Sequence, residues 1–342
     1  MKRRLVLASA LATTAAIAVP SLVRAQGTEQ RRVAVAVGGK TSFFYLPFVL
    51  GETLGYFKDE GLDLTSLDFS GGSRALQAVV GGSADVVSGA FDHVIELQPK
   101  GQYFRAFGLQ GRTPTYALAV AKPRWSQVKS AADLKGMKIG VTAPGSSTHM
   151  FVNLVLARAG LKSSDVSIIA SGQGAQAMAA VRAGNVDAIA ISDPVITMLV
   201  QAGDIRVLAD ARTVKGCTEV FGGLMPAGCL HASESYVQKN PDIVQALANG
   251  LVRVLHWIVR AGPSDLVNTM PQVLQLGDRK LYIDAFNNVR ETYSPDGIIT
   301  DAAARTAARS LATIEDHIDP ARIEYGRLYT NEFVQRSAKK YA

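Results

Sequence analysis

The chain is poor in cysteine and has no cluster of basic residues in its main part, and each shortage excludes a class of protein. Two cysteines in 342 residues are too few for a disulfide-rich scaffold or a cysteine-rich metal centre. Beyond residue 25, no Lys/Arg cluster with interleaved aromatic residues occurs, so nucleic acid is a poor choice of partner. We expect no metal and no cofactor.

Long apolar runs are missing too, except for one at the amino end. Lys2, Arg3 and Arg4 precede the uncharged run LVLASALATTAAIAVP, and Val23-Arg24-Ala25 follows as an A-x-A-like ending. This order is typical of a secretory signal peptide, and the run is too short and too polar for a membrane anchor. We predict a signal peptide over residues 1–25 and a periplasmic protein, with Sec and twin-arginine export both left open.

Removal of residues 1–25 changes the charge of the protein. The formal net charge of +7 falls to +3, because that segment holds four basic residues and no acidic one. The remaining residues suffice for two domains.

Cys217 and Cys229 would mature in an oxidising compartment. A disulfide between them and two free thiols stay equally open, since sequence spacing does not fix geometry.

Strand-like and helix-like segments alternate twice along the chain. Apolar runs at 32–39, 62–70 and 84–90 enclose helical patterns at 43–61 and 71–82, and the same order returns over residues 136–192. Alternation with short glycine-rich joints predicts parallel sheets covered by helices. At an offset of 102 residues the two stretches share seven identities: Gly38/Gly140, Gly72/Gly174, Ala75/Ala177, Ala78/Ala180, Val79/Val181, Gly82/Gly184 and Asp85/Asp187.

The repeat predicts an α/β protein of two similarly built lobes. Extended runs flank the second repeat, near TYALAVA and MPAGCLHAS, so we expect the chain to cross to that lobe and return on two crossover strands. We assign residues 31–118 and 226–342 to lobe 1 and residues 119–225 to lobe 2. The carboxyl-terminal third is helical, with an amphipathic helix that begins near Asn240-Pro241, and we expect it to pack on lobe 1.

Four strand-to-helix joints are rich in Gly, Ser or Thr: residues 38–44, 70–74, 143–149 and 171–176. In open parallel sheets, ligands bind where such joints and helix starts converge. Glycine lets the backbone approach a ligand, hydroxyls donate hydrogen bonds, and the free N–H groups of a first helical turn favour negative charge. Ordinary helix capping explains any one joint, but four joints facing one cleft indicate a binding site.

The joint at 143–149 allows three interpretations. Ser147 and His149 could be a nucleophile and its base, but the pattern is G-x-S-x-H instead of G-x-S-x-G, and close neighbours on a helix point in diverging directions. Residues 146–149 could also simply cap the helix. We favour a helix start that holds a ligand, with His149 facing the cleft.

The joint GQGAQA also fits the G-x-G-x-x-A pattern of dinucleotide-binding loops, with Asp193 near the place of a ribose-binding acid. Export removes the protein from the usual dinucleotide pools, and the equivalent joint GGSRA keeps only the second glycine. We therefore predict a tight turn here. Asp92 and Asp193 each follow a strand, and capping is the better prediction for both.

Aromatic residues and one lysine complete the candidates. Phe43, Phe44, Tyr45 and Phe91 lie at borders between loops and helices. Core packing is the commoner role of such residues, yet a cleft lined by them would accept a flat or apolar ligand. Lys40 is either a charge partner for an anion or a solvated side chain.

Several stretches resemble the solute-binding proteins of ABC importers in the nitrate, sulfonate and taurine group. The similarity runs from about residue 31 to residue 257 and rests on GYFKDEGLDLTSLDFSGGSRALQAVVGGSADVVSGA, AADLKGMKIGV, GSSTHMFVNLVLARAGL and NPDIVQALANGLVRVLHWIVR. The resemblance implies a type II periplasmic binding protein with two crossover strands, a monomer that closes on its solute and docks onto a membrane permease. The ligand-binding residues that it implies are Lys40, Thr41, Ser42, Phe43, Phe44, Gly72, Ser73, Ala90, Phe91, Ser146, Ser147, Thr148, His149 and Asp193.

The identity of the solute does not follow from the resemblance. Members of the group take nitrate, alkylsulfonates, taurine, pyrimidine precursors or aromatic acids. A related branch synthesises the thiamine pyrimidine and carries clustered cysteines, which Cys217 and Cys229 do not reproduce. We therefore expect a binding protein for a small, anionic organic solute, not an enzyme. A ligand-sensing module for a membrane partner would have the same fold and stays an alternative.

Overall fold

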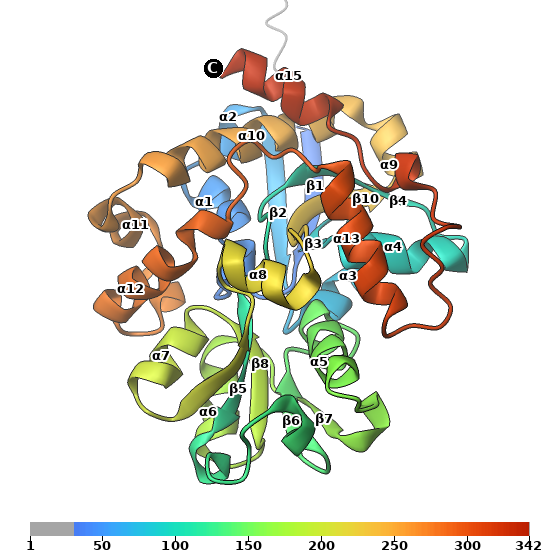
Figure 1. Ribbon diagram of the computed structural model, residues 1–342. Helices are drawn as coiled ribbons and strands as arrows, with labels where there is room; N and C mark the ends of the chain where they lie inside the picture. Colours follow the sequence, from blue (N-terminus) through green and yellow to red (C-terminus); the bar gives the residue numbers. More distant parts are fainter. Residues whose placement is uncertain (1–30, 342) are drawn as a thin grey trace, which may run out of the picture.

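The computed structural model describes residues 31–341, which form two lobes, each built on a five-stranded sheet (Figure 1). The expected signal peptide lies outside the described residues. The first sheet has the order β2-β1-β3-β10-β4 and the second β7-β6-β8-β5-β9. The strands of the first sheet are β1 (Arg31–Val37), β2 (Leu62–Asp68), β3 (Val86–Ala90), β4 (Phe104–Leu109) and β10 (Gly228–Ser233). Those of the second are β5 (Tyr116–Ala121), β6 (Lys138–Val141), β7 (Ser167–Ala170), β8 (Ala188–Ser192) and β9 (Ile205–Asp210).

One antiparallel strand in each sheet marks a crossing between the lobes. β1 pairs in parallel with β2 and β3, and β6 with β7 and β8. By contrast, β10 runs antiparallel to β3 and β4, and β5 runs antiparallel to β8 and β9. Since β5 follows the first lobe in sequence and β10 follows the second, these are the two expected crossover strands.

The first crossing lies earlier than predicted. The predicted boundary between residues 118 and 119 falls inside β5, but every residue of this strand from Tyr116 onward pairs in the second sheet. The chain therefore leaves the first lobe before Tyr116. The uniformly apolar strand YALAVA gives no sign in the sequence of which sheet it joins, because both of its faces are buried.

Helices cover both faces of each sheet, as expected for buried parallel strands. In the first lobe they are α1 (Leu46–Thr53), α2 (Tyr56–Asp59), α3 (Gly72–Val80) and α4 (Asp92–Leu97), preceded by the 3-10 turn η1 (Phe43–Tyr45). In the second they are α5 (Ser147–Arg158), α6 (Gly174–Arg182), α7 (Val195–Gln201) and α8 (Val214–Phe221). None of the helices within residues 31–341 is long and apolar enough to cross a membrane.

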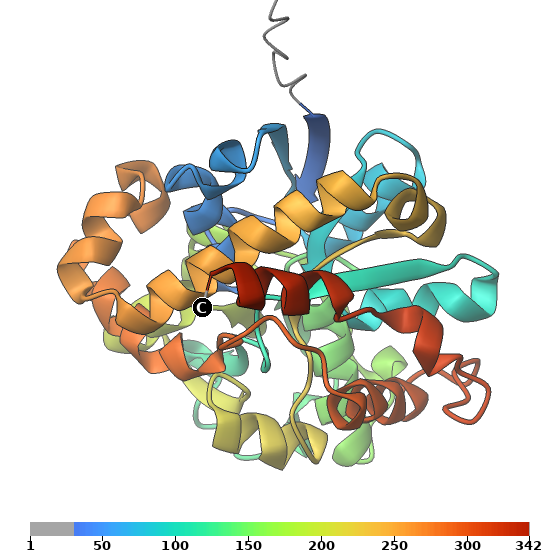
Figure 2. The same ribbon diagram turned by 90° about the horizontal axis from the view of Figure 1, so that it is seen from above.

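The carboxyl-terminal part consists of helices that reach both lobes. They are α9 (Glu234–Lys239), α10 (Pro241–Arg260), α11 (Pro263–Thr269), α12 (Arg279–Val289), α13 (Asp301–Ala312), α14 (Tyr325–Leu328) and α15 (Glu332–Lys340). As expected, α10 packs on α1 and α2 of the first lobe, and α15 lies beside α10 (Figure 2). In addition, α12 packs against α7 and α13 against α5 and α8, so this part also contacts the second lobe (Figure 1).

Candidate functional site

The four predicted joints meet in one small cavity between the lobes. Its lining comes from two strands of the second sheet and from helix starts of both lobes. The lining residues are Ser42, Phe44, Tyr45, Gly72, Tyr116, Thr142, Ser146, Ser147, Thr148, Gln173 and Ser192. The cavity volume, measured for the centre of a water-sized sphere, is about 10 Å³, which is room for roughly one water molecule. The structure is therefore a closed form.

Hydrogen bonds between the lobes hold this closed form. At the joint of α3 and α5, the backbone N–H of Ser73 donates to Ser146 Oγ over 3.1 Å. The Ser73 hydroxyl donates to the carbonyl oxygen of Pro144 over 2.9 Å, and His93 Nε2 lies 3.2 Å from the carbonyl oxygen of Gly145. Each of these contacts joins a residue of lobe 1 to the loop before α5.

The other two joints meet in the same way. The Gln173 amide at the start of α6 donates to the carbonyl oxygen of Gly38 over 3.1 Å, and the hydroxyls of Ser42 and Ser192 are hydrogen-bonded to each other. The backbone N–H of Phe43 donates to the carbonyl oxygen of Asp193 over 2.8 Å. All four joints therefore contribute contacts between the lobes.

The start of α5 has a fixed local backbone. Gly145 has a φ of +77°, which glycine adopts without strain, and Ser146 is extended before the helix begins. The hydroxyl of Thr148 accepts from the backbone N–H of Thr142 over 3.1 Å, which ties the first turn of α5 to the end of β6. The side chain of Ser146 caps no backbone N–H of its own helix, so it is available to the opposite lobe.

The cavity is polar but carries no charge. Of the eleven lining residues, eight have hydroxyls, one has an amide, and none has a charged side chain. Burial, with added repulsion from the Asp92 carboxylate, raises the pKa of both Tyr45 and Tyr116, so both phenols stay protonated donors. Hydroxyls and helix starts can hold an anion or a polar group without a counter-charge.

Six predicted residues line the cavity, and the others lie elsewhere. The six are Ser42, Phe44, Gly72, Ser146, Ser147 and Thr148. Lys40 points away, because its ammonium pairs with Glu52 at 2.9 Å. Ala90 and Phe91 are buried in the core of the first lobe, where Phe91 packs against Tyr329.

Four further predicted residues do not line the cavity but contact other parts of the protein near it. Ser73 bridges to the opposite lobe, as described above, and Thr41 lies against Gly174 of that lobe, since a Cβ at Gly174 would come within 2.8 Å of Thr41 Oγ1. Phe43 packs edge-on against Tyr282 of α12, with ring centroids 4.8 Å apart. His149 Nδ1 accepts from the backbone N–H of Gly145 over 3.1 Å, so this imidazole braces the loop instead of facing the cavity.

Asp193 is a buried structural residue and does not line the cavity. Its side chain is fully buried, and one carboxylate oxygen lies 3.2 Å from a guanidinium nitrogen of Arg212. The other accepts from the backbone N–H of Thr197 in the first turn of α7 over 2.9 Å. The prediction of a cap is therefore confirmed for Asp193. Asp92 is also buried and accepts from the backbone N–H of the next residue, His93.

Five lining residues were not among the predicted ones: Tyr45, Tyr116, Thr142, Gln173 and Ser192. Gln173 lies inside a predicted joint, and Tyr45 lies at the border between a loop and a helix, where core packing is the commoner role. Thr142 and Ser192 stand at the ends of β6 and β8, in the positions where strand ends meet the cleft. Tyr116 could not be found by this rule, because it begins the crossover strand.

The rival interpretations of the two second-lobe joints receive no support from the geometry. His149 bonds to Gly145, not to Ser147, and burial lowers the pKa of His149, against an opposing effect of the Glu315 carboxylate. Ser147 therefore lacks the base that a nucleophile needs. Gly172 and Gly174 have φ values of +66° and +53°, as expected for the tight turn that we predicted at GQGAQA.

The two cysteines form no disulfide. Cys217 on α8 and Cys229 on β10 are both buried and free. Cys217 Sγ lies 3.5 Å from the carbonyl oxygen of Gly223, and Cys229 Sγ lies 3.4 Å from His231 Nδ1. Of the two alternatives left open by the sequence, two free thiols are correct. No group of three or more metal-ligating side chains within residues 31–341 is arranged to hold a metal ion.

A larger groove lies on the second lobe alone. It has a volume of about 620 Å³ and runs between α5, β9 and α8, with Val155, Leu208 and Val220 among its lining residues. Since all of its walls belong to one lobe, a ligand there would gain nothing from closure of the two lobes. The interlobe cavity is therefore the candidate site.

Comparison with known proteins places the chain in a family. Residues 42–261 match the model of the family described as NMT1/THI5 like. The chain belongs to this family. A protein from Bordetella bronchiseptica RB50 of solved structure is 51% identical, with a TM-score of 0.89 over 91% of this chain and 98% of that one.

Two relatives of this NMT1/THI5-like protein have names that state a ligand. A putative aliphatic sulfonates-binding protein of Escherichia coli K12 is 30% identical over 181 residues, which span 53% of this chain and 53% of that relative. The alkanesulfonate-binding protein SsuA of Xanthomonas axonopodis pv. citri, solved bound to MOPS, has a TM-score of 0.70 at 21% identity and covers 88% of this chain and 98% of its own. The second likeness shows the periplasmic binding protein fold, and both relatives are binding proteins, not enzymes.

Proposed function

We propose that the protein is the extracytoplasmic solute-binding component of an ABC importer and that it binds a small, anionic organic solute between its lobes. The observation that carries the proposal is the interlobe cavity, to which both lobes contribute hydroxyls and helix starts. A ligand held by both lobes stabilises the closed form over the open one, because it has its full set of partners only there. A membrane permease can recognise that difference in shape.

The anionic character of the solute rests on helix starts. α3 and α5 begin at the cavity from opposite lobes, and the start of α6 supplies Gln173. The first N–H groups of a helix carry partial positive charge and attract anions, by about 0.3–1 kcal/mol per exposed helix end. The names of the two relatives state aliphatic sulfonates and alkanesulfonate as ligands, and an acid group of that kind would suit these donors.

Calorimetric titration with sulfonates, carboxylates, nitrate and pyrimidines tests the proposal. We expect saturable binding of at least one acid. Ser147→Ala should weaken that binding about tenfold, through the loss of one hydrogen bond to a charged group. Ser163→Ala, which changes a more exposed serine of the same lobe, is the matched control and should leave the affinity unchanged.

Catalytic turnover would contradict the proposal. If the protein hydrolysed an ester or an amide, and Ser147→Ala abolished that hydrolysis, the cavity would be an active site. Failure of every acid in the titration to bind would equally contradict a solute-binding role.

A further inference from the structure

The segment between α11 and α12, residues 271–278, has an unusual backbone, and we call it the strap. Leu276 is the one non-glycine residue within residues 31–341 with a positive φ, at +54°, and Gly277 follows it at +87°. A leucine in this left-handed region is unfavourable, because its Cβ approaches the neighbouring carbonyl oxygen. Such a conformation persists only where the surrounding structure holds it, which is commonest at functional sites.

The Leu276 side chain packs on the second lobe. It lies against an apolar cluster whose other members all fall within residues 117–207. A Cβ at Gly174, the first residue of α6, would come within 3.4 Å of Leu276 Cδ2 and within 2.8 Å of Thr41 Oγ1. Leu276 therefore contacts lobe 2 at the point where Thr41 of lobe 1 also meets it, next to Gln173 of the cavity lining.

The helix that follows the strap is attached to the first lobe near both of its ends. Near the start of α12, the Tyr282 ring packs on the ring of Phe43. Just beyond its end, the Tyr293 hydroxyl donates to the carbonyl oxygen of Phe43 over 3.0 Å. Since α12 also contacts α7 (Figure 1), the strap lies where the lobes adjoin. When the lobes separate, it moves with lobe 1, and Leu276 leaves the start of α6.

A buried amide holds the strap in shape. The side-chain nitrogen of Gln275 donates to the carbonyl oxygen of Val267 over 2.9 Å and to that of Met270 over 2.8 Å. These bonds tie the strap to the end of α11, and Gln275 is only 3% exposed. The residue before Leu276 is thus fixed on the side of lobe 1. A contact made by a segment that is already ordered loses little conformational entropy when it forms.

We propose that the strap is a latch for the closed form. Leu276 is carried by lobe 1 and packs on the start of α6 in lobe 2 as the lobes approach. This contact removes apolar surface from water only in the closed form, so it raises the population of that form in the protein without solute. Leu276 is not among the residues that line the cavity. The strap therefore sets the balance of open and closed forms independently of the solute that the cavity accepts.

Distances between spin labels on the two lobes test this inference in the protein without solute. Labels attached through Ser83→Cys in lobe 1 and Ser163→Cys in lobe 2 use exposed positions, while Cys217 and Cys229 are 0% exposed and stay unlabelled. We expect a closed and an open distance, and Leu276→Asn should lower the ratio of closed to open about fivefold or more, through loss of an apolar contact. Asparagine adopts a positive φ more readily than leucine, so this change adds no strain.

Two further variants are the controls. Leu276→Met keeps an apolar side chain of similar volume and should keep the ratio within about twofold. Val273→Asn changes a residue of the same strap that is 79% exposed, and it should leave the ratio unchanged. Coinciding distance distributions of the wild type and Leu276→Asn would overturn the latch, as would a wild type without a measurable closed population. Neither result bears on whether the cavity binds an acid, which the calorimetric titration decides separately.

Discussion

At the scale of single residues, the cavity is lined by neutral side chains, while charged residues nearby form ion pairs within the fold. Lys40, the cation that the sequence offered for an anion, is paired with Glu52. Asp193 is paired with Arg212 beneath the cavity. Such pairing is expected, because a buried charge without a partner is costly. An anionic solute of the kind proposed would therefore be held by hydroxyls and backbone N–H groups.

Asp193→Asn removes one partner of a buried ion pair and should destabilise the protein by about 3 kcal/mol. This is the lower end of the range for such a loss, because Arg212 keeps a second partner, Asp210, at 2.7 Å. Denaturant unfolding measures this change. Asp284→Asn, at an exposed pair with Lys280, should cost less than about 1 kcal/mol. If Asp193→Asn instead weakened solute binding and left stability unchanged, Asp193 would be a ligand residue after all.

Gly71 gives a second test, this time of closure. A Cβ at this position would come within 2.7 Å of the Ala143 Cβ on the opposite lobe. The φ of Gly71 is 174°, an extended value that alanine also adopts. Gly71→Ala should therefore oppose closure without straining the open form.

We expect Gly71→Ala to weaken solute affinity at least tenfold in calorimetry, and to leave the Tm of the ligand-free protein within about 2 °C. Gly326→Ala is the matched control, because a Cβ at Gly326 meets nothing within 4 Å. Unchanged affinity in Gly71→Ala would show that solute binds without closure of this joint.

The site could be predicted from the sequence only to the level of loops. The repeated joints led to residues 42, 44 and 146–148, which line the cavity, because the carboxyl ends of parallel strands must meet in one cleft. Which side chain of a joint faces the cleft depends on the residue at which the helix begins. A shift of that start by one residue turns a different side chain toward the cleft. Ser42 and Phe44 therefore line the cavity while Phe43, between them, packs against Tyr282.

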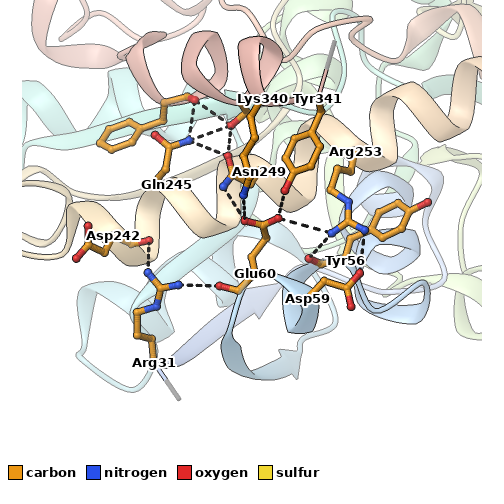
Figure 3. Close-up of polar contacts among 12 residues, drawn as sticks. Arg31, Tyr56, Asp59, Glu60, Asp242, Gln245, Asn249, Arg253, Lys340 and Tyr341 are labelled. Atoms are coloured by element: carbon orange, nitrogen blue, oxygen red, sulfur yellow. Dashed lines mark hydrogen bonds and ion pairs between the residues drawn. The ribbon is translucent and has the colours of Figure 1, made fainter. Parts of the chain in front are cut away.

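At the scale of elements, a polar cluster fixes the carboxyl-terminal helices to the first lobe (Figure 3). Glu60, next to α2, accepts from Asn249 of α10 over 2.7 Å and from Lys340 of α15 over 2.9 Å, and Tyr341 also donates to it. Its backbone carbonyl accepts from Arg31 at the start of β1 over 2.7 Å. One side chain thus joins three segments that are far apart in the sequence.

The cluster predicts a dependence of stability on pH. Burial alone would raise the pKa of Glu60, but hydrogen bonds from Tyr341, Lys340 and Asn249 outweigh it, and the pKa lies below its usual value of 4.5. A carboxylate with a lowered pKa stabilises the fold above its unfolded pKa, and this contribution is lost as the pH falls through the folded value. Glu60→Gln should cost roughly 1–3 kcal/mol at neutral pH.

Unfolding free energies measured between about pH 6 and about pH 3 test this prediction. The wild type should lose more stability over that range than Glu60→Gln, so that the two curves approach each other in acid. Glu219→Gln is the control, since Glu219 is 65% exposed and only 3.8 Å from Lys215, and its curve should follow that of the wild type. Parallel curves for Glu60→Gln would show that the cluster does not titrate as described.

The elements themselves were largely predictable from the sequence, but the packing partners of two carboxyl-terminal helices were not. The spacing of apolar residues and the glycine-rich joints predicted the strands and helices of both lobes, because a buried face requires that spacing. The sequence did not show that α12 and α13 reach the second lobe. Helix contacts of this kind depend on the relative position of the lobes, which no local pattern encodes.

At the scale of the whole molecule, two similar lobes meet at matching joints, and the carboxyl-terminal helices span both (Figure 1). The cavity in the closed form has space for roughly one water molecule. A solute of any larger size could be held only with the lobes further apart than they are in this structure. Under the proposed function, binding and a change of shape would thereby be coupled, as a receptor for a permease requires.

Small-angle X-ray scattering in solution, with and without a bound acid, tests this coupling most directly. We expect the radius of gyration of the wild type to decrease on addition of a saturating acid, and the radius of Gly71→Ala to decrease less. An acid that binds in calorimetry and leaves the radius of the wild type unchanged would contradict closure of the two lobes around the solute.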